Sequence, residues 1–327
     1  MKRNLRLLLL LTLIFATRGA FALTAVTTSV DVGEPVTAVM FTPVPGAVAG
    51  IVDSEGRDVC WSTGFVLDSE PGGSAQVFPL AIGPAGVAGT YEILIMIDGT
   101  VLSRSSVEVH AREFLREEIV LNESLTELRQ ARDPVKDEEA RALHLLLQQV
   151  NPARVYELGP FVHPLENSRV TSWFGDRRTY RYSDGGVSYA IHAGIDLGAP
   201  DGASPGDLAG QTVVAAGRGR VAFAGARIVT GNSVVLEHLP GVFSLYYHLE
   251  QTTVQVGQVV EAGTVIGTVG MTGLATGPHL HWEFRIRDIA VNPETMVECS
   301  LLDIRTLFST IREHDATGAV ALLVGRR

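Results

Sequence analysis

The sequence predicts a mainly β protein in which two β regions are joined by a helical connector. Glycine is abundant, at 34 of 327 residues, and many glycines separate short runs rich in Val, Ile and Thr, which is typical of strands joined by tight turns. Between residues 112 and 150 charges become frequent and Leu and Ile recur at helical spacing. Hydrophobic residues make up 46% of the chain, so each of about two modest domains can bury a core.

Residues 23–110 are predicted to form a small N-terminal β-sandwich, for which an immunoglobulin-like arrangement is one candidate. Short apolar runs alternate there with Gly, Pro and Asp at the spacing of sandwich strands. Asp98-Gly99 lies between two apolar runs and predicts a hairpin with a type I′ turn, because both residue types tolerate positive φ. The region contains no catalytic constellation, so recognition or spacing is its expected role.

Residues 111–152 are predicted to be a helical connector. Four apolar residues with roughly helical spacing predict its first helix: Leu115, Ile119, Leu125 and Leu128. Asp133 followed by Pro134 is typical of an N-cap and a first helical position, and predicts a second helix that continues to Val150. We expect both helices to be structural.

From residue 168 to about residue 293 the chain returns to β signals. The polar stretch 200–208, rich in Gly and Pro, is predicted to be a loop. Residues 296–327 form a C-terminal tail, in which 301–311 is a candidate helix.

Residues 1–22 are predicted to be a signal peptide. Three basic residues precede an apolar run, and the small-x-small pattern at 20–22 predicts cleavage before Leu23. An uncleaved membrane anchor is the alternative, but the run is shorter than the roughly 20 residues of a span. We therefore expect an exported protein of the periplasm, cell envelope or extracellular space, with no stable membrane span after cleavage.

The mature chain is acidic. Cleavage removes four basic residues and no acidic ones, so the formal net charge changes from −10 to −14. This charge argues against nucleic acid as a partner, because phosphates require a basic surface. Cys60 and Cys299 lie in different predicted regions; export permits a disulfide between them, and two separate buried thiols fit equally well.

Four of the nine histidines occur in three unusual segments. These are His192-Ala-Gly-Ile-Asp196, Tyr246-Tyr-His248-Leu and Gly277-Pro-His279-Leu-His281-Trp-Glu283. Each segment alone is weak, because a histidine in a strand is more often a hydrogen-bonded core residue than a ligand. Two imidazoles and a carboxylate together match the ligands of a catalytic zinc, which keeps a fourth position open for water.

Strand geometry limits how these residues can meet. His279 and His281 share one face of a strand, roughly 7 Å apart at the backbone. His192 and Asp196 would lie roughly 13 Å apart in an extended chain, too far for ligands that bind at about 2 Å. The segment must bend, and Gly194 is the residue that permits it.

The His192-x-x-x-Asp196 and His279-x-His281 motifs resemble the lysostaphin/LytM-type zinc endopeptidases. The similarity covers residues 165–295, about 40% of the chain. It extends in order through Arg169–Arg177, Ile191–Pro200, Gly231–His238, Tyr247–Leu249, Val256–Gly267 and Gly273–Glu283, with Asn292-Pro293 at the end. The resemblance implies an antiparallel β peptidase domain over 165–295.

The resemblance also implies the roles of five residues. His192, Asp196 and His281 would be the Zn²⁺ ligands, and His248 and His279 the two catalytic histidines. The substrates would be peptide bonds in peptidoglycan cross-links or stem peptides, and the N-terminal domain is a candidate contact for an envelope protein partner. Segments 177–189 and 200–215 are expected to be loops at the cleft, and their sequences leave the substrate open.

The chemistry would combine metal and acid–base catalysis. Zinc lowers the pKa of bound water toward about 7, and histidine titrates near working pH. His248 and His279 would orient and deprotonate the water and assist the oxyanion or the leaving amine. Glu283 shares a strand face with His281 and is either a partner of its imidazole or an exposed rim carboxylate.

The remaining side chains receive structural interpretations. Trp282 and Phe284 alternate away from the metal face and are expected in the core. No role is assigned to the other five histidines: His110, His144, His163, His238 and His314.

Two other functions are alternatives to peptidase activity. Non-enzymatic regulators of cell-wall hydrolases share this fold after losing metal ligands, but here every ligand position is retained. A lipoyl- or biotinyl-type carrier would explain the Gly-punctuated stretch 254–270, but a carrier requires a modifiable lysine and none occurs between 252 and 293. The sequence leaves open the bond that is cut, the division of roles between His248 and His279, and the oligomeric state.

Overall fold

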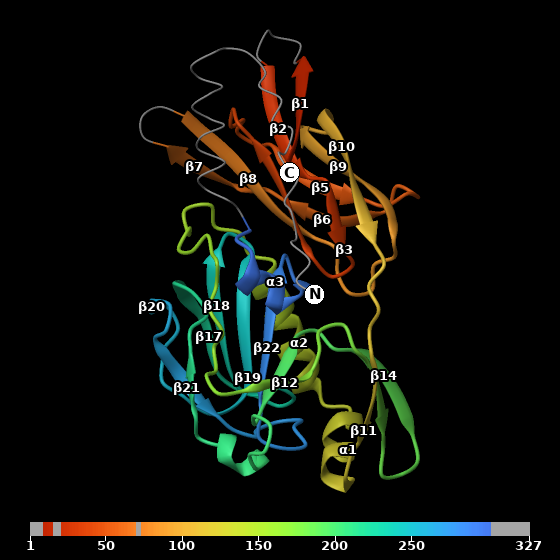
Figure 1. Cartoon of the computed structure of the whole chain (residues 1–327), viewed down its shortest axis with the longest axis vertical. Helices are drawn as coiled ribbons and strands as arrows, with labels where there is room; N and C mark the ends of the chain where they lie inside the picture. Colours follow the sequence, from red (N-terminus) through yellow and green to blue (C-terminus); the bar gives the residue numbers. More distant parts are fainter. Residues whose placement is uncertain (1–8, 16–20, 70–72, 302–327) are drawn as a thin grey trace.

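The computed structural model describes residues 9–15, 21–69 and 73–301. These residues form two β domains packed end to end, with a short helical segment between them in sequence (Figure 1). The prediction of a mainly β protein is confirmed. No helix within the described ranges is long and apolar enough to cross a membrane.

The N-terminal domain consists of two five-stranded sheets. The first has the order β1 (Leu9–Phe15), β2 (Phe21–Thr27), β4 (Pro35–Met40), β8 (Gly73–Ala81), β7 (Phe65–Ser69). The second has the order β3 (Ser29–Asp31), β10 (Thr100–His110), β9 (Gly89–Ile97), β5 (Val48–Val52), β6 (Asp58–Ser62). Buried residues of both sheets share one core, as in a sandwich, while the immunoglobulin-like relationship stays a prediction.

The hairpin predicted at Asp98-Gly99 is confirmed. Asp98 has φ 47° and Gly99 has φ 77°, and Ile97 pairs with Thr100 on either side of them. The sandwich also buries Cys60, whose thiol is free, as is that of Cys299. The predicted signal peptide includes β1, an edge strand, so cleavage before Leu23 would remove that strand from the sheet.

The connector differs from its prediction in its first part. Residues 116–120 form strand β11 (Arg116–Val120) instead of a helix, because they pair in parallel with β13 (Arg177–Arg181). Two helices follow, α1 (Glu123–Gln130) and α2 (Pro134–Leu147). Asp133 caps α2 through its side chain, which accepts from Val135 N, and Pro134 occupies the first turn as predicted.

Residues 177–189 also depart from their prediction. They belong to a hairpin of β13 and β14 (Val187–Ile191), which forms a small sheet of order β11-β13-β14. The predicted loop 200–208 contains turns and one 3₁₀ turn, η1 (Pro205–Leu208). The candidate helix 301–311 falls outside the described residues, apart from residue 301.

The C-terminal domain is built on one large sheet in which every pairing is antiparallel. Its main path runs β12 (Arg169–Ser172), β15 (Ile195–Gly198), β22 (Leu280–Ile286), β19 (Val242–Thr252), β18 (Gly231–Leu239), β17 (Gly219–Arg227), β20 (Val259–Val260). Strands β16 (Thr212–Val214), β21 (Val265–Val269) and β23 (Ile289–Val291) extend it, and α3 (Pro293–Glu298) follows. Trp282 and Phe284 are fully buried in its core, as predicted.

The two domains share a continuous apolar contact. Four residues of the sandwich belong to the same buried cluster as the core of the C-terminal domain: Val39, Phe41, Phe65 and Val77. Asn292 N donates to Gly33 O at 2.9 Å, and Asn292 Nδ2 donates to the buried Glu34 Oε1 at 3.3 Å. The sandwich is therefore packed against one end of the C-terminal domain (Figure 1).

Candidate metal and catalytic site

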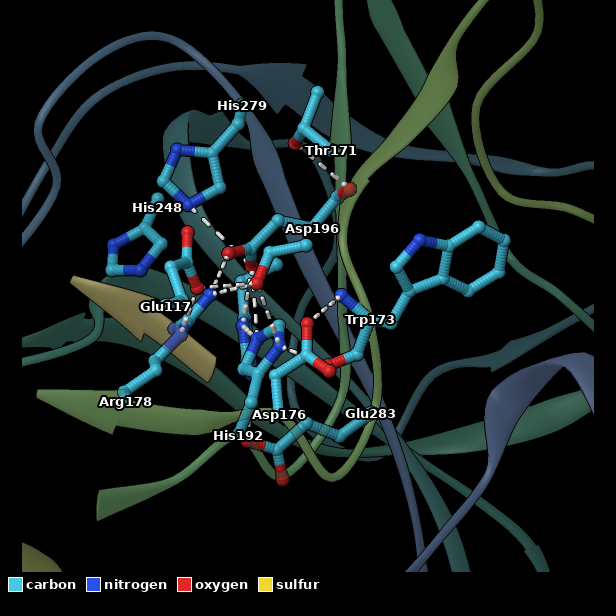
Figure 2. A network of polar contacts seen from close by, with 12 residues as sticks. Glu117, Thr171, Trp173, Asp176, Arg178, His192, Asp196, His248, His279 and Glu283 are labelled. Atoms are coloured by element: carbon cyan, nitrogen blue, oxygen red, sulfur yellow. Dashed lines mark hydrogen bonds and ion pairs between the residues drawn. The ribbon is translucent and has the colours of Figure 1, made fainter. Parts of the chain in front are cut away.

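Three predicted ligands from separate parts of the chain converge. Asp196 on β15 lies directly opposite His281 on β22 in the antiparallel register, and His192 precedes β15. His281 Nδ1 is 2.8 Å from Asp196 Oδ1 and 3.0 Å from His192 Nε2, and His192 Nε2 is 3.2 Å from Asp196 Oδ1. Figure 2 shows this cluster, all of which is buried.

Gly194 allows His192 and Asp196 to approach each other. The chain leaves β14 of the small sheet at residue 191 and enters β15 of the large sheet at residue 195, so the two side chains meet across a short bend. A Cβ on residue 194 would lie 2.2 Å from the carbonyl oxygen of Trp282. Only glycine fits this close approach to β22, in agreement with the predicted bend.

The hydrogen-bond partners of His192 and His281 determine which ring nitrogen of each faces the cluster. His192 Nδ1 is 2.8 Å from the carbonyl oxygen of Trp173, which can only accept, so the ring's Nε2 lone pair faces the cluster. His281 Nε2 donates to Glu283 Oε1 at 2.8 Å, which leaves Nδ1 facing the cluster. Two imidazole nitrogens and a carboxylate oxygen therefore face one another within hydrogen-bonding distance, and they repel unless a proton or a metal ion lies among them.

Burial and the mutual contacts of the three residues also shift their pKa values. Burial lowers the pKa of His281, but hydrogen bonds and charge from Asp196 and Glu283 outweigh it and raise that pKa to about 9. Burial lowers the pKa of His192 despite the opposing effect of Asp196, so that ring stays neutral. Burial opposes ionisation of Asp196, yet the two histidines hold its pKa well below the usual range.

The donor set suits zinc. Three ligands on tetrahedral zinc, with bonds of about 2.0–2.1 Å, lie roughly 3.3 Å from one another. The observed spacings of 2.8, 3.0 and 3.2 Å are within a few tenths of an ångström of that value. Two imidazoles and one carboxylate also leave the open coordination position that catalytic zinc sites keep.

His248 and His279 lie beside the cluster. Their ring centroids are 4.9 Å apart, and His279 Nε2 is 3.7 Å from Asp196 Oδ1. His248 Nδ1 donates to Thr272 O and His279 Nδ1 donates to Gly277 O, both at 2.8 Å, so each ring has its Nε2 lone pair available. Burial and the neighbouring histidines lower the pKa of His248 to about 3, which keeps the ring neutral at physiological pH.

The backbone of His248 is unusual. Its φ is 61°, a left-handed value rare for residues other than glycine, within a stretch of β19 where the register with β18 shifts. Its N–H donates to Thr230 O at 2.9 Å, which holds this conformation. Such backbone strain is concentrated at functional sites.

Glu283 is the partner of His281, so the interpretation as an exposed rim carboxylate is wrong. The side chain is 5% exposed and bridges His281 Nε2 at 2.8 Å and Arg285 Nε at 2.6 Å. Burial raises its pKa, but Arg285 and His281 together depress the value well below the usual range. Tyr247 stacks on the other side of His281, with ring centroids 5.5 Å apart.

Two functional neighbours were missed by sequence reasoning. Arg178 on β13 pairs with Asp196 Oδ2, and Glu117 on β11 accepts from Arg178 Nε at 2.9 Å. The only sequence signal was the Arg177-Arg178 pair beside a motif of the resemblance. No sequence signal points to Glu117, because it lies outside the segment that resembles the zinc endopeptidases.

The site opens into a cleft of about 400 Å³. Its lining includes Asp196, His248, His279 and His281, together with residues of β11, β13 and the segment 198–205. Segments 177–189 and 200–215 both border the cleft, as predicted. The residues that line it are Arg178 and Tyr180 from the first segment and 200–203 and 205 from the second.

Three of the histidines without an assigned role have partners elsewhere in the fold. His238 is fully buried between Phe161 and Phe284, with its two nitrogens bonded to Arg218 O and Ser244 Oγ. His110 and His144 contact Ser29 and Asp288, respectively. His314 lies outside the described residues.

The comparisons with known proteins agree with the site. Residues 190–293 match peptidase family M23. The DD-carboxypeptidase/endopeptidase Mpg of Neisseria meningitidis is 40% identical over 138 residues, which are 42% of this chain and 29% of that protein. The peptidoglycan DD-endopeptidase ShyC of Vibrio cholerae is 36% identical over 133 residues, 41% of this chain and 28% of that protein.

A solved M23 peptidase structure from Pseudomonas aeruginosa shares the fold. It matches with a TM-score of 0.53 and 22% identity, over 80% of this chain and 92% of that chain. The matched segments span less than a third of the curated relatives' length. The match of residues 190–293 to peptidase family M23 agrees with the resemblance to zinc endopeptidases that the motifs indicated.

Proposed function

We propose that this chain is an exported zinc metalloendopeptidase that hydrolyses peptide bonds in peptidoglycan cross-links or stem peptides. The observation that carries the proposal is the convergence of His192 Nε2, Asp196 Oδ1 and His281 Nδ1, three acceptor atoms within 3.2 Å of one another. The names of the relatives support peptidoglycan as the substrate, and the predicted signal peptide supports export.

His192, Asp196 and His281 would hold the zinc ion. Bound there, zinc would polarise the scissile carbonyl and acidify a water molecule, as in other zinc hydrolases. Glu283 and the Trp173 carbonyl fix the tautomers of His281 and His192.

His248 and His279 would handle the protons. The carbonyls of Thr272 and Gly277 hold each Nδ1–H, so each Nε2 is free to accept a proton from water or to bond the substrate. The low pKa of His248, about 3, makes that ring a weak base that stays neutral near pH 7. A neutral ring is suited to orienting the water molecule through Nε2. His279 lies nearer to Asp196 and is the better placed to accept the proton and pass it to the leaving amine.

The test is digestion of purified peptidoglycan by the mature chain, with and without a zinc chelator. We expect new amino termini and separated cross-linked muropeptides, identified by mass spectrometry, in the sample without chelator only. A zinc-loaded protein that releases no fragments would contradict the proposal and favour the regulator of other wall hydrolases. His279→Ala, which leaves the three ligands in place, is the matched inactive control.

A further inference from the structure

Arg178 is shared between the candidate ligand Asp196 and Glu117. Its Nη2 pairs with Asp196 Oδ2 and also donates to Ser172 Oγ at 2.7 Å, and its Nε donates to Glu117 Oε2 at 2.9 Å. Ser172 Oγ in turn donates to Glu117 Oε2 at 2.7 Å. Figure 2 shows Glu117 and Arg178 next to Asp196, on the side of the cluster that carries β11 and β13.

In this arrangement the two carboxylate oxygens of Asp196 have different partners. Oδ2 is taken by Arg178, and Oδ1 alone faces His192, His281 and His279. The side chains of Arg178 and Asp196 are each 11% exposed, so their pairing is screened little by water. Burial disfavours the charge of Arg178, but Asp196 and Glu117 outweigh it and raise its pKa.

A cation so close to Asp196 competes with a metal ion for the same carboxylate. Glu117 offsets this competition because its carboxylate forms an ion pair with Arg178 Nε and neutralises the charge of the guanidinium. Without Glu117, Arg178 would pair with Asp196 alone and would leave an uncompensated positive charge beside a divalent cation. Both effects weaken metal binding.

We propose that Glu117 is a positioning residue for the metal site and acts through Arg178. The proposal rests on the assignment of Asp196 as a ligand in the proposed function. Glu117 lies on β11, which precedes the domain that matches peptidase family M23 by about 70 residues. The connector is thus part of the site, and it also lines the cleft through Ile119 and Leu121.

The main test is zinc affinity of the full mature chain, measured by competition with a chromophoric chelator. Glu117→Gln keeps the size of the side chain and removes its charge, and we expect the Kd for zinc to rise about 10- to 100-fold. Glu118→Gln is the matched control, because Glu118 is the next residue of β11 and pairs with Arg181 on the opposite face, with half of its side chain exposed. Its zinc Kd should stay within about twofold of the wild type.

Two further measurements separate positioning from a general structural effect. In an Arg178→Gln background, Glu117→Gln should no longer change the zinc Kd, because the side chain through which it acts is gone. The visible spectrum of the Co²⁺-loaded protein should change in Glu117→Gln and stay the same in Glu118→Gln. Glu117→Asp retains the charge and should recover most of the affinity.

An unchanged zinc Kd in Glu117→Gln would overturn the proposal, as would an equal effect of that substitution with and without Arg178. These readouts do not require peptide cleavage. A wild-type chain that binds zinc, responds to Glu117→Gln and cuts no peptidoglycan would contradict the proposed function and leave this inference standing.

Discussion

Four histidines meet at the site, and each has one ring nitrogen bonded to a fixed acceptor. The acceptors are the carbonyls of Trp173, Thr272 and Gly277 and the carboxylate of Glu283. Each ring therefore presents one defined nitrogen to the cleft. This preorganisation would let the proposed ligands His192 and His281 and the proposed catalytic residues His248 and His279 work side by side with different protonation states.

The proposed catalytic histidines can be distinguished from the proposed ligands by experiment. His279→Ala should lower kcat for peptidoglycan cleavage by about 10²–10⁴-fold, the usual contribution of a positioned acid–base group. It should keep one zinc per chain, because its nearest approach to the cluster is 3.7 Å to Asp196. Kinetics together with metal analysis measure both quantities, and loss of zinc with activity would reassign His279 as a ligand.

Glu283 should control zinc binding through His281. In Glu283→Gln the acceptor for His281 Nε2–H is weakened and Arg285 loses its buried counter-charge. We expect the zinc Kd to rise about 10- to 100-fold. Thermal melting of the metal-free variant reports the lost buried pair separately, and an unchanged Kd would show that His281 needs no partner.

The residues of this site were largely predictable from the sequence. The bend at Gly194, the shared face of His279 and His281 and the burial of Trp282 follow from local geometry. The sequence is compatible with two interpretations of Glu283, because strand alternation predicts the face of a side chain but not its partner. Arg178 and Glu117 could not be assigned, because their link to Asp196 depends on strand pairing across the chain.

At the scale of elements, three neighbouring strands carry most of the site residues. β15 and β22 carry Asp196 and His281 as a cross-strand pair, and β19 carries Tyr247 and His248 on the other side of β22. The left-handed turn of the backbone at His248 lets consecutive residues of β19 both reach the cluster region. Tyr247 stacks on His281 while His248 approaches His279.

Helix α2 packs against strands β18 and β19. Leu147, at its end, is fully buried against Val235, Phe243, Leu245 and Tyr247. Leu147→Ala should reduce the free energy of unfolding by about 2–5 kcal/mol, the cost of a cavity in a packed core. Leu145→Ala is the matched control, because Leu145 is 58% exposed on the same helix. Equal effects of the two substitutions in urea denaturation would contradict this packing.

Helix α2 was predictable and β11 was not, for a physical reason. The cap Asp133 and the first-turn Pro134 are local signals that lie together in the sequence. β11 exists because it pairs with β13, about 60 residues later, and isolated parallel pairing leaves little local pattern. The apolar residues 115 and 119 have helical spacing, but Leu115 is 64% exposed and Ile119 faces the cleft.

At the scale of the whole molecule, the sandwich and the peptidase domain share a core. Phe174 of the peptidase domain lies so close to Gly33 that a Cβ there would be 2.4 Å from its ring. Thr37 Oγ1 also donates to Leu301 O at 2.9 Å. The sequence indicated two β domains, but their packing depends on complementary surfaces that no sequence pattern encodes.

The buried His238 should make the fold sensitive to acid. Burial lowers its pKa to about 4 in the folded chain, whereas an unfolded histidine titrates near 6.5. Between these values the unfolded chain binds the extra proton, so stability falls as the pH drops from about 6.5 to about 4, by on the order of 3 kcal/mol. Below about 4 both states are protonated and this contribution is fully lost.

The measurement is urea denaturation from pH 7.5 to pH 4 for the wild type and His238→Asn. The variant should be less stable at pH 7.5, because it loses packing against Phe161 and Phe284. Its stability should fall less between pH 6.5 and 4, since the titrating ring is gone. Identical pH dependence in the two proteins would assign the acid sensitivity to other groups.

The central claim is that His192, Asp196 and His281 bind one metal ion. Crystals grown with zinc, measured at the zinc absorption edge, give the most direct test. We expect one anomalous peak at about 2.0–2.2 Å from His192 Nε2, Asp196 Oδ1 and His281 Nδ1, with a fourth position open to the cleft. A zinc-saturated protein with no peak among these atoms, or with its peak elsewhere, would contradict the claim.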